Sequence, residues 1–367
     1  MKIAFDHQTF TCQSYGGISR YYTILADELI KQNQDVKVFA GMHRNNYITD
    51  LSEGVVKGVK LNKYPQKSGR LFQWLNHGIS QIQMKSWQPD LIHETYYSSL
   101  PTLKTDAVRI TTVHDMIHEL FSDQFSPRDK TTQWKKKTFE RVDHIISISH
   151  NTKRDLIELF GIDQSKISVV HHGVDLKAFQ QPKIDNYYKN HSYVLYVGSR
   201  GGYKNFDGLL KACSRSVFIK NKVKIIAFGG GRFNSHELGL IKKLGFKDGF
   251  VEQVGGTDEL LASLYANALC FVYPSLYEGF GLPPLEAMAA ECPVVSSNTS
   301  SMPEVVNQAG IYFDPSNTDE MCYAIETVIV DNELRSKLIQ LGLLNIKLFS
   351  WNKCASETLR IYKSFTC

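Results

Sequence analysis

The stretch from Tyr273 to Val295, YPSLYEGFGLPPLEAMAAECPVV, decides the fold of this chain. It predicts the end of a buried strand, a glycine-rich loop, a helix that begins at Pro283 and Pro284, and another strand. Proline is tolerated in a first helical turn because the N–H groups there have no helical partner. Gly279 and Gly281 allow a sharp backbone turn and the close approach of a ligand. The free N–H groups of the loop and the helix start therefore predict an anion site.

Two carboxylates frame this loop: Glu278 precedes it, and Glu286 is expected in the first helical turn. Carboxylates would repel an anion on contact, but they accept hydrogen bonds from neutral hydroxyls on either side of it. The loop therefore suits a ligand that has hydroxyls, then phosphates, then further hydroxyls, and a nucleotide sugar is such a ligand. Each part also has a simpler interpretation, since a glutamate in a first turn often only complements the helix dipole and Gly-Phe-Gly is often only a turn.

The whole string is more specific than its parts. EGFGLPPLE, from Glu278 to Glu286, resembles the paired-glutamate signature of glycosyltransferase family 4, which has the GT-B fold. The resemblance implies that Glu278 contacts the donor sugar and Glu286 the ribose of the nucleotide. It assigns the loop between them to the same donor site: Gly279, Phe280, Gly281 and Leu282.

Length and composition predict a two-domain globular protein without a bound nucleic acid. The 367 residues exceed the usual size of one core, and the hydrophobic and charged fractions of 43% and 22% are ordinary. The net charge of +5 is mild, and no helix-turn-helix or zinc-finger pattern occurs. Seven scattered cysteines without a C-x-x-C pair suit reduced thiols, and no apolar run has transmembrane length. We expect a cytoplasmic protein, peripheral on the inner face of the membrane.

Strand and helix patterns alternate through both halves, which predicts an α/β fold of two doubly wound sheets. Residues 1–175 form the expected N-terminal acceptor domain and residues 176–350 the C-terminal donor domain, with a linker over residues 171–192. The resemblance implies two Rossmann-like domains facing a central cleft. It also implies that the last helix, over residues 351–367, crosses back to the N-terminal domain.

Three further groups complete the predicted site. Gly16 and Gly17 lie between the first strand and a helix, where backbone N–H groups can meet an anion; the alternative is a plain tight turn. Arg200 and Lys204 lie in the turn YVGSRGGYKN, and the resemblance implies that both hold the diphosphate, with Lys204 the firmer assignment. Without the resemblance, the simpler interpretation is that Arg200 and Lys204 are two solvated side chains of a loop.

His114 and Asp115 end a strand and resemble the active-site position of mannosyl-type family members. A histidine there could donate to a sugar hydroxyl or position the acceptor. His118 and Glu119 follow closely and compete for that role, and a lone histidine is more often structural.

We expect no bound cofactor and no required metal, because no Asp-x-Asp occurs in the chain. The nearest sequence, Asp331-Asn332-Glu333, predicts a helix cap instead. The triplet Gly229-Gly230-Gly231 predicts a turn that approaches the nucleotide closely.

Residues 55–89 contain six Lys or Arg side chains and no Asp or Glu. This basic and aromatic segment could rest on an anionic membrane surface, as could the smaller cluster Lys135-Lys136-Lys137. The alternative for residues 55–89 is a solvated face over a helix that packs on the core.

The pattern as a whole predicts a retaining, metal-independent glycosyltransferase of surface polysaccharide or lipopolysaccharide biosynthesis. Its partners would be a nucleotide-sugar donor and a glycan or lipid-linked oligosaccharide acceptor, and GDP-mannose is the favoured donor. UDP-glucose, UDP-N-acetylglucosamine and dTDP-rhamnose remain open as donors. Three other functions also remain: a nucleotide-sugar epimerase, a non-catalytic glycan-binding protein and a membrane scaffold.

Overall fold

The computed structural model describes residues 1–100, 102, 105–175, 177–180 and 191–366. The chain divides into unit 1, Met1–Gly173 with Trp351–Cys367, and unit 2, Val174–Ser350. Of the predicted linker, residues 176 and 181–190 lie outside the described residues. Within the described ranges, no helix combines the length and the apolar character that crossing a bilayer requires.

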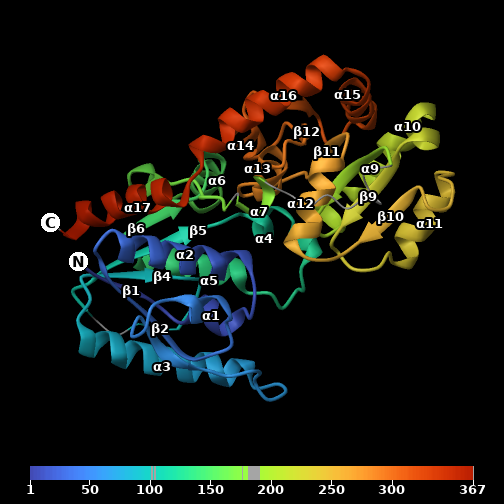
Figure 1. Ribbon diagram of the computed structural model, residues 1–367. Helices are drawn as coiled ribbons and strands as arrows, with labels where there is room; N and C mark the ends of the chain where they lie inside the picture. The colour runs from blue at the N-terminus through green and yellow to red at the C-terminus, as the bar shows by residue number, and fades with distance from the viewer. Residues whose placement is uncertain (101, 103–104, 176, 181–190, 367) are drawn as a thin grey trace. The chain divides into compact units, whose positions relative to one another are not determined.

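Unit 1 is built on a seven-stranded parallel sheet with the order β3-β2-β1-β4-β5-β6-β7 (Figure 1). Its strands are β1 (Lys2–Phe5), β2 (Asp35–His43), β3 (Val56–Lys60), β4 (Leu91–Glu94), β5 (Val108–Val113), β6 (His144–Ser147) and β7 (Ile167–Val169). Its helices are α1 (Gln8–Cys12), α2 (Gly17–Lys31), α3 (Gly69–Trp87), α4 (Ile117–Leu120), α5 (Thr131–Arg141), α6 (His150–Phe160) and α17 (Trp351–Thr366). Short 3-10 turns are η1 (Tyr47–Asp50), η2 (Ser122–Gln124) and η3 (Gln164–Lys166).

Unit 2 has a six-stranded parallel sheet with the order β10-β9-β8-β11-β12-β13. Its strands are β8 (Tyr193–Val197), β9 (Lys224–Phe228), β10 (Val251–Val254), β11 (Cys270–Tyr273), β12 (Val294–Ser297) and β13 (Gly310–Phe313). The helices are α7 (Lys177–Gln180), α9 (Phe206–Arg215), α10 (Val217–Lys222), α11 (Ser235–Lys243), α12 (Asp258–Asn267), α13 (Leu282–Ala289), α14 (Met302–Val306), α15 (Thr318–Val330) and α16 (Asn332–Asn345). The 3-10 turns are η4 (Gly202–Lys204) and η5 (Ile346–Leu348).

Each sheet is doubly wound, so the predicted α/β class is confirmed. In unit 1 the order of connection reverses between β1 and β4, and in unit 2 it reverses between β8 and β11. Ligands of such sheets bind beyond the carboxyl ends of the strands at the reversal. The sequence prediction missed two edge strands, β3 and β13. In β3, within the segment taken for a basic insert, four of the five side chains are exposed, so no buried apolar run marks it.

The last helix belongs to unit 1. α17 packs beside α2, and its buried residues Ala355, Leu359 and Tyr362 share a core with Tyr22 and Leu25 (Figure 1). The Tyr362 hydroxyl also hydrogen-bonds the buried ring of His93 on β4. Apolar burial of about 1.5–3 kcal/mol per large side chain is the main force that holds such a helix in place.

Candidate functional site

An ion pair marks the reversal point of the unit 2 sheet. The Lys204 Nζ lies 2.7 Å from the Glu278 Oε1, and Glu278 is only 7% exposed. Lys204 ends the turn that follows β8, and Glu278 lies in the loop that follows β11, the neighbouring strand. An ammonium has three donors, so the pair leaves Lys204 able to bind an anion as well. The structure therefore brings together two of the predicted donor-site residues.

The backbone around Lys204 is held by Asn205. This residue has a φ of 55°, a left-handed conformation that asparagine tolerates better than most side chains. Its side-chain Nδ2 donates to the carbonyl oxygens of Pro274, at 3.0 Å, and Pro315, at 2.8 Å. Asn205 thus ties the loop after β8 to the loop after β11, which keeps Lys204 opposite Glu278.

The Gly-Phe-Gly loop leads into α13 through Gly281. Gly281 is the N-cap, with a φ of 109° that a side chain would strain, and a Cβ there would lie 2.4 Å from the Met302 Cε. The Ser301 hydroxyl is within hydrogen-bond distance of the carbonyls of Glu278 and Phe280, at 2.9 and 2.7 Å. The Phe280 side chain is buried against Phe349, so only its backbone can serve a ligand.

The expectation that Glu286 lies in the first turn of its helix is wrong. α13 begins at Leu282, before the two prolines, so Glu286 is the fifth helical residue and the first turn contains no acidic residue. The Tyr265 hydroxyl lies 3.4 Å from the Glu286 Oε2, and the side chain is partly exposed. Glu286 is therefore not a partner of the helix dipole, because a carboxylate interacts favourably with the dipole only in the first turn.

Arg200 has a different environment from Lys204. Its guanidinium is buried and pairs with Glu237, with 2.8 Å between Nε and Oε1. It also donates to the carbonyl of Gly229 at 2.7 Å and to that of Arg232 at 3.1 Å. These contacts hold the loop of Gly229, Gly230 and Gly231, in which all three glycines have positive φ. Arg200 therefore stabilises the glycine loop in this structure.

Glu237 has two roles in the same cluster. It completes the capping box of α11 with Asn234 and accepts the Arg200 ion pair. Burial alone would raise the pKa of Glu237, but the hydrogen bonds from Arg200 and from the Asn234 backbone outweigh it and lower the pKa. The carboxylate is therefore ionised at neutral pH.

In unit 1 the Gly16-Gly17 pair begins α2. Gly16 is the N-cap with an extended backbone, and a Cβ there would lie 2.3 Å from the Gln13 Oε1. That oxygen accepts the backbone N–H of Ser19 at 3.1 Å, so one of the first-turn donors is already satisfied. Gly17 has open space where a Cβ would lie. Close packing thus explains a glycine at position 16 and leaves position 17 unexplained.

His114 is buried among aromatic rings, and its Nε2 has no hydrogen-bond partner within the part of the chain that the structure describes. Its ring lies edge-on to Tyr21 at 5.2 Å and stacks on His172 at 5.5 Å. Burial lowers the pKa of His114 to about 3, so the imidazole is neutral. The neighbouring Asp115 accepts the backbone N–H of Ile117, the first residue of α4, at 3.1 Å.

Glu119, one of the two residues that compete with His114 for the active-site role, forms an ion pair with Lys135 of the second basic cluster. The Glu119 Oε2 lies 2.7 Å from the Lys135 Nζ, and Lys135 is 1% exposed. The expectation of an exposed cluster at Lys135-Lys136-Lys137 is therefore wrong for Lys135, because α5 turns that side chain towards α4 and only the next two remain exposed. His118 stacks on Phe125, with 4.1 Å between the ring centroids.

The sequence prediction missed His7, which directly follows β1 at the reversal point of the unit 1 sheet. It lines a cavity of about 370 Å³ together with the segment after β4. Its position immediately after the first buried strand was the signal that could have found it.

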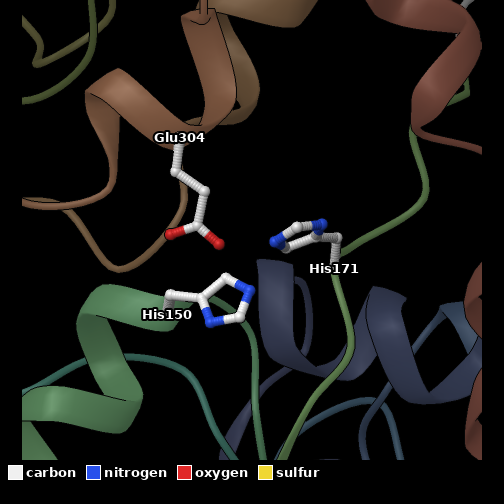
Figure 2. A group of neighbouring side chains, drawn as sticks. All are labelled: His150, His171 and Glu304. Carbon is white, nitrogen blue, oxygen red and sulfur yellow. The ribbon is translucent and has the colours of Figure 1, made fainter.

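His150 and His171 form a second pair of histidines in unit 1. His150 begins α6, His171 follows β7, and their ring centroids are 6.0 Å apart at 74° (Figure 2). Glu304, drawn with them, belongs to α14 in unit 2. Within the described residues of unit 1, no third possible ligand joins the two rings, so unit 1 alone does not form a metal centre.

Comparison with known families gives two matches that together span most of the chain. The family described as "Glycosyltransferase Family 4" matches residues 15–178, and "Glycosyl transferases group 1" matches residues 178–342. O-antigen chain mannosyltransferase B of Escherichia coli is 32% identical over 267 residues, which cover 69% of this chain and 70% of that protein. O-antigen chain mannosyltransferase RfbU of Salmonella typhimurium is 28% identical over 236 residues, which cover 64% of each chain.

Solved structures agree on the fold. Sucrose-phosphate synthase from Thermosynechococcus elongatus has a TM-score of 0.74 at 21% identity, covering 99% of this chain and 98% of that one. Anabaena Alr3699/HepE in complex with UDP-glucose has a TM-score of 0.70 at 18% identity, covering 98% of this chain and 99% of that one. The fold is GT-B, and the chain belongs to the family 4 glycosyltransferases.

Proposed function

We propose that this glycosyltransferase moves mannose from GDP-mannose to a glycan or lipid-linked glycan of a surface polysaccharide, with retention of configuration and without a metal. The observation that carries the proposal is the Lys204–Glu278 pair at the reversal point of the unit 2 sheet. The choice of mannose follows the E. coli and Salmonella relatives, both named as O-antigen mannosyltransferases. UDP-glucose, UDP-N-acetylglucosamine and dTDP-rhamnose are the competing donors.

The donor would bind in unit 2. Lys204 and the backbone N–H groups of Gly281 and Leu282, which precede the two prolines of α13, would stabilise the negative charge that develops on the leaving diphosphate. Glu278 would accept a hydrogen bond from a hydroxyl of the donor sugar, and Glu286 from the ribose. In this proposal the bond from the anomeric carbon to the diphosphate oxygen breaks as the acceptor oxygen bonds to that carbon on the same face. The acceptor's proton then goes to the leaving phosphate, so no covalent nucleophile is needed.

The acceptor would bind in unit 1, where His114 has a neutral imidazole and an unpartnered Nε2. A neutral imidazole can exchange a hydrogen bond with a sugar hydroxyl without bringing a second positive charge close to the transferred sugar. His114 would position a sugar and would not act as a strong general base, since its pKa is far below neutrality.

The direct test is transfer by the purified chain from a panel of nucleotide sugars to glycan acceptors, with and without EDTA. The proposal expects GDP-mannose to be used best, the α-linked product to form and EDTA to leave the rate unchanged. If the protein binds UDP more tightly than GDP, the donor is a UDP sugar and not GDP-mannose. Release of an epimerised sugar from donor and water, with no acceptor, would favour the epimerase alternative.

We also propose that α3 rests on an anionic membrane surface. This helix buries the polar residues Asn76, Ser80 and Gln81, whereas it exposes apolar side chains on its outer face. The exposed apolar residues are Leu71, Trp74, Leu75 and Ile82. At 100° per residue all four fall within about one third of the helix circumference. Arg70 and Lys85 belong to the same helix, and residues 55–89 contain no carboxylate, so an anionic lipid surface complements it.

A further inference from the structure

The buried lysine of α5 contacts the segment that follows β5, the strand after which His114 and Asp115 lie. Lys135 is 1% exposed, and its ammonium has three neighbours on this segment and on α4. The Nζ donates to the Asp115 carbonyl at 2.8 Å and to the Glu119 Oε2 at 2.7 Å. It also lies 3.8 Å from the sulfur of Met116. One side chain thus joins α5 to the turn that leads from β5 into α4.

The stability of the fold does not by itself explain a buried ion pair at this place. An ammonium is costly to bury unless it is paired and hydrogen-bonded, and Glu119, whose side chain is 6% exposed, supplies the opposite charge. Replacement of such a pair by apolar side chains of similar volume is often neutral or stabilising. The feature that an apolar pair could not provide is the hydrogen bond from Lys135 to the Asp115 carbonyl.

The helix that carries Lys135 is itself fixed to the sheet. The Arg141 Nε donates to both carboxylate oxygens of Glu94, at 3.0 and 3.1 Å, and Glu94 is the last residue of β4. The Thr138 hydroxyl accepts the backbone N–H of Ser98, in the segment after β4, at 3.2 Å. These contacts tie α5 to the strand that neighbours β5 in the sheet, so the ammonium of Lys135 is presented from a fixed support.

Asp115 is held at two points, and Lys135 supplies one of them. The Asp115 Oδ1 accepts the backbone N–H of Ile117 at 3.1 Å, and the Asp115 carbonyl accepts the ammonium. No backbone N–H within the described residues donates to this carbonyl. Loss of the lysine would therefore release the peptide that joins Asp115 to Met116. The side chain of Asp115 and that of His114, the residue before it, would then lose a fixed direction.

We propose that Lys135 is a positioning residue of the transfer reaction, which acts through the Asp115 carbonyl to orient Asp115 and His114. Glu119 provides the counter-charge that allows the lysine to be buried there. With 1% exposure the lysine does not itself reach a ligand. The proposal rests on the proposed function, which places His114 at the acceptor, and adds the residue that holds this part of the site in place.

The decisive variant is K135M/E119L, which removes both charges of the pair and leaves the Asp115 carbonyl without its donor. It is compared with K135M alone and with K153M, the matched control. Lys153 also donates to a backbone carbonyl, that of Ile167 at 2.8 Å, but it belongs to α6. The melting temperature, the affinity for GDP and the rate of transfer from GDP-mannose at varied acceptor concentration are measured for each full-length protein.

K135M should lower the melting temperature by about 10 °C, because it leaves the Glu119 carboxylate buried and unpaired. The double variant should melt close to the native protein, yet its kcat/KM for the acceptor should fall by about 10- to 100-fold. Misplacement of a contact group by about 1 Å has an effect of this size. The GDP affinity of the double variant and the rate of K153M should not change. Native transfer by the double variant, or an equal loss of its GDP affinity, would overturn the proposal.

A second measurement needs no substrate and so separates this proposal from the proposed function. Hydrogen exchange of the Ile117 amide, which donates to the Asp115 carboxylate, should be about fivefold or more faster in the double variant. This factor corresponds to the loss of about one typical hydrogen bond. The Thr152 amide, which donates to the Ser149 hydroxyl at 3.0 Å, should exchange at the native rate. Unchanged exchange at Ile117 would overturn the positioning role. Faster exchange in a chain that neither binds GDP nor transfers sugar would support that role and reject the proposed function.

Discussion

Lys204 and Glu278, 74 residues apart in the sequence, form a partly buried ion pair with 2.7 Å between Nζ and Oε1. Each follows one of the two strands at which the unit 2 sheet reverses its order of connection. In the proposed complex the cation would pair with the diphosphate of a nucleotide-sugar donor, and the carboxylate would accept a hydroxyl of its sugar.

Replacement of Glu278 by Ala should remove transfer while the fold stays intact. The carboxylate accepts from the donor sugar in the proposed complex, and the loss of one such contact typically costs about 100- to 1000-fold in rate. The measurement is the initial rate of transfer, with circular dichroism to check the fold. The control Glu333→Gln removes an exposed carboxylate from α16 and should leave the rate unchanged. Full activity of a well-folded E278A protein would remove Glu278 from the site.

Lys204→Met should weaken nucleoside diphosphate binding by about tenfold or more, because a hydrogen bond to a charged group contributes about 1.5–3 kcal/mol. Calorimetry with GDP and with guanosine would separate the diphosphate contact from the base contact. Lys211→Met, at an exposed position of α9, is the matched control. Equal GDP affinity in K204M and the native protein would contradict the assignment.

Arg200→Gln should destabilise unit 2 by about 3–5 kcal/mol, since it leaves the Glu237 carboxylate without its partner. The melting temperature should fall by about 10 °C or more. Arg215→Gln breaks an exposed ion pair with Asp319 and should cost less than about 1 kcal/mol. GDP affinity, measured well below the melting temperature, tests the predicted phosphate contact: a loss as large as that of K204M would show that Arg200 also reaches the nucleotide.

The same variant has a predicted effect on acid stability. The folded pKa of Glu237 is lowered, so its contribution is full above its ordinary pKa of 4.5 and is lost as the pH falls. The native protein should therefore lose more stability than R200Q between pH 6 and pH 3.5. Urea denaturation across this range measures the difference. Parallel pH curves for the two proteins would contradict the effect.

Unit 1 should lose stability on mild acidification because of its buried histidines. Burial lowers the pKa of His7, His93 and His114 to about 3, whereas each has a pKa near 6.5 when unfolded. The unfolded chain then binds more protons than the folded one, so stability rises with pH and falls below 6.5. Each histidine should cost about 1.4 kcal/mol between pH 7.5 and 5.5.

Urea denaturation at these two pH values, followed by tryptophan fluorescence, measures this loss. His114→Asn removes one titrating group and should reduce the loss by about 1.4 kcal/mol, the share of one histidine. His144 and His172, whose pKa burial also lowers, contribute to the loss that remains. A loss that is identical in H114N and the native protein would show that His114 is already protonated when folded.

Membrane contact through α3 should depend on its exposed apolar stripe and on anionic lipid. Trp74→Ser with Leu75→Ser should reduce co-sedimentation with vesicles that contain phosphatidylglycerol. Binding to purely phosphatidylcholine vesicles should be weak for every variant. Val217→Ser with Phe218→Ser removes comparable exposed apolar side chains from α10 in unit 2 and is the control. Equal losses in both double variants, or no binding by the native chain, would contradict the proposal.

Alternation of buried strands with amphipathic helices was enough to predict two doubly wound parallel sheets. Local rules also predicted the Asp331 cap, whose side chain accepts the Leu334 N–H at 2.8 Å. Both succeed because strand and helix periodicity and capping depend on residues a few positions apart. The edge strand β3 was missed because its exposed residues form no buried apolar run, whereas β13 was missed although it is a short, partly buried strand that ends at the buried Phe313.

What each charged side chain touches was decided only by tertiary structure. Arg200 and Lys204 occupy one turn, yet the first is buried with Glu237 and the second faces Glu278. Lys135 and Lys136 are adjacent, yet one is buried and the other exposed. The sequence alone determined the periodic backbone and the types of groups near each strand end. The partners come from other elements tens of residues away, and parallel strands bring them together only when the sheet assembles.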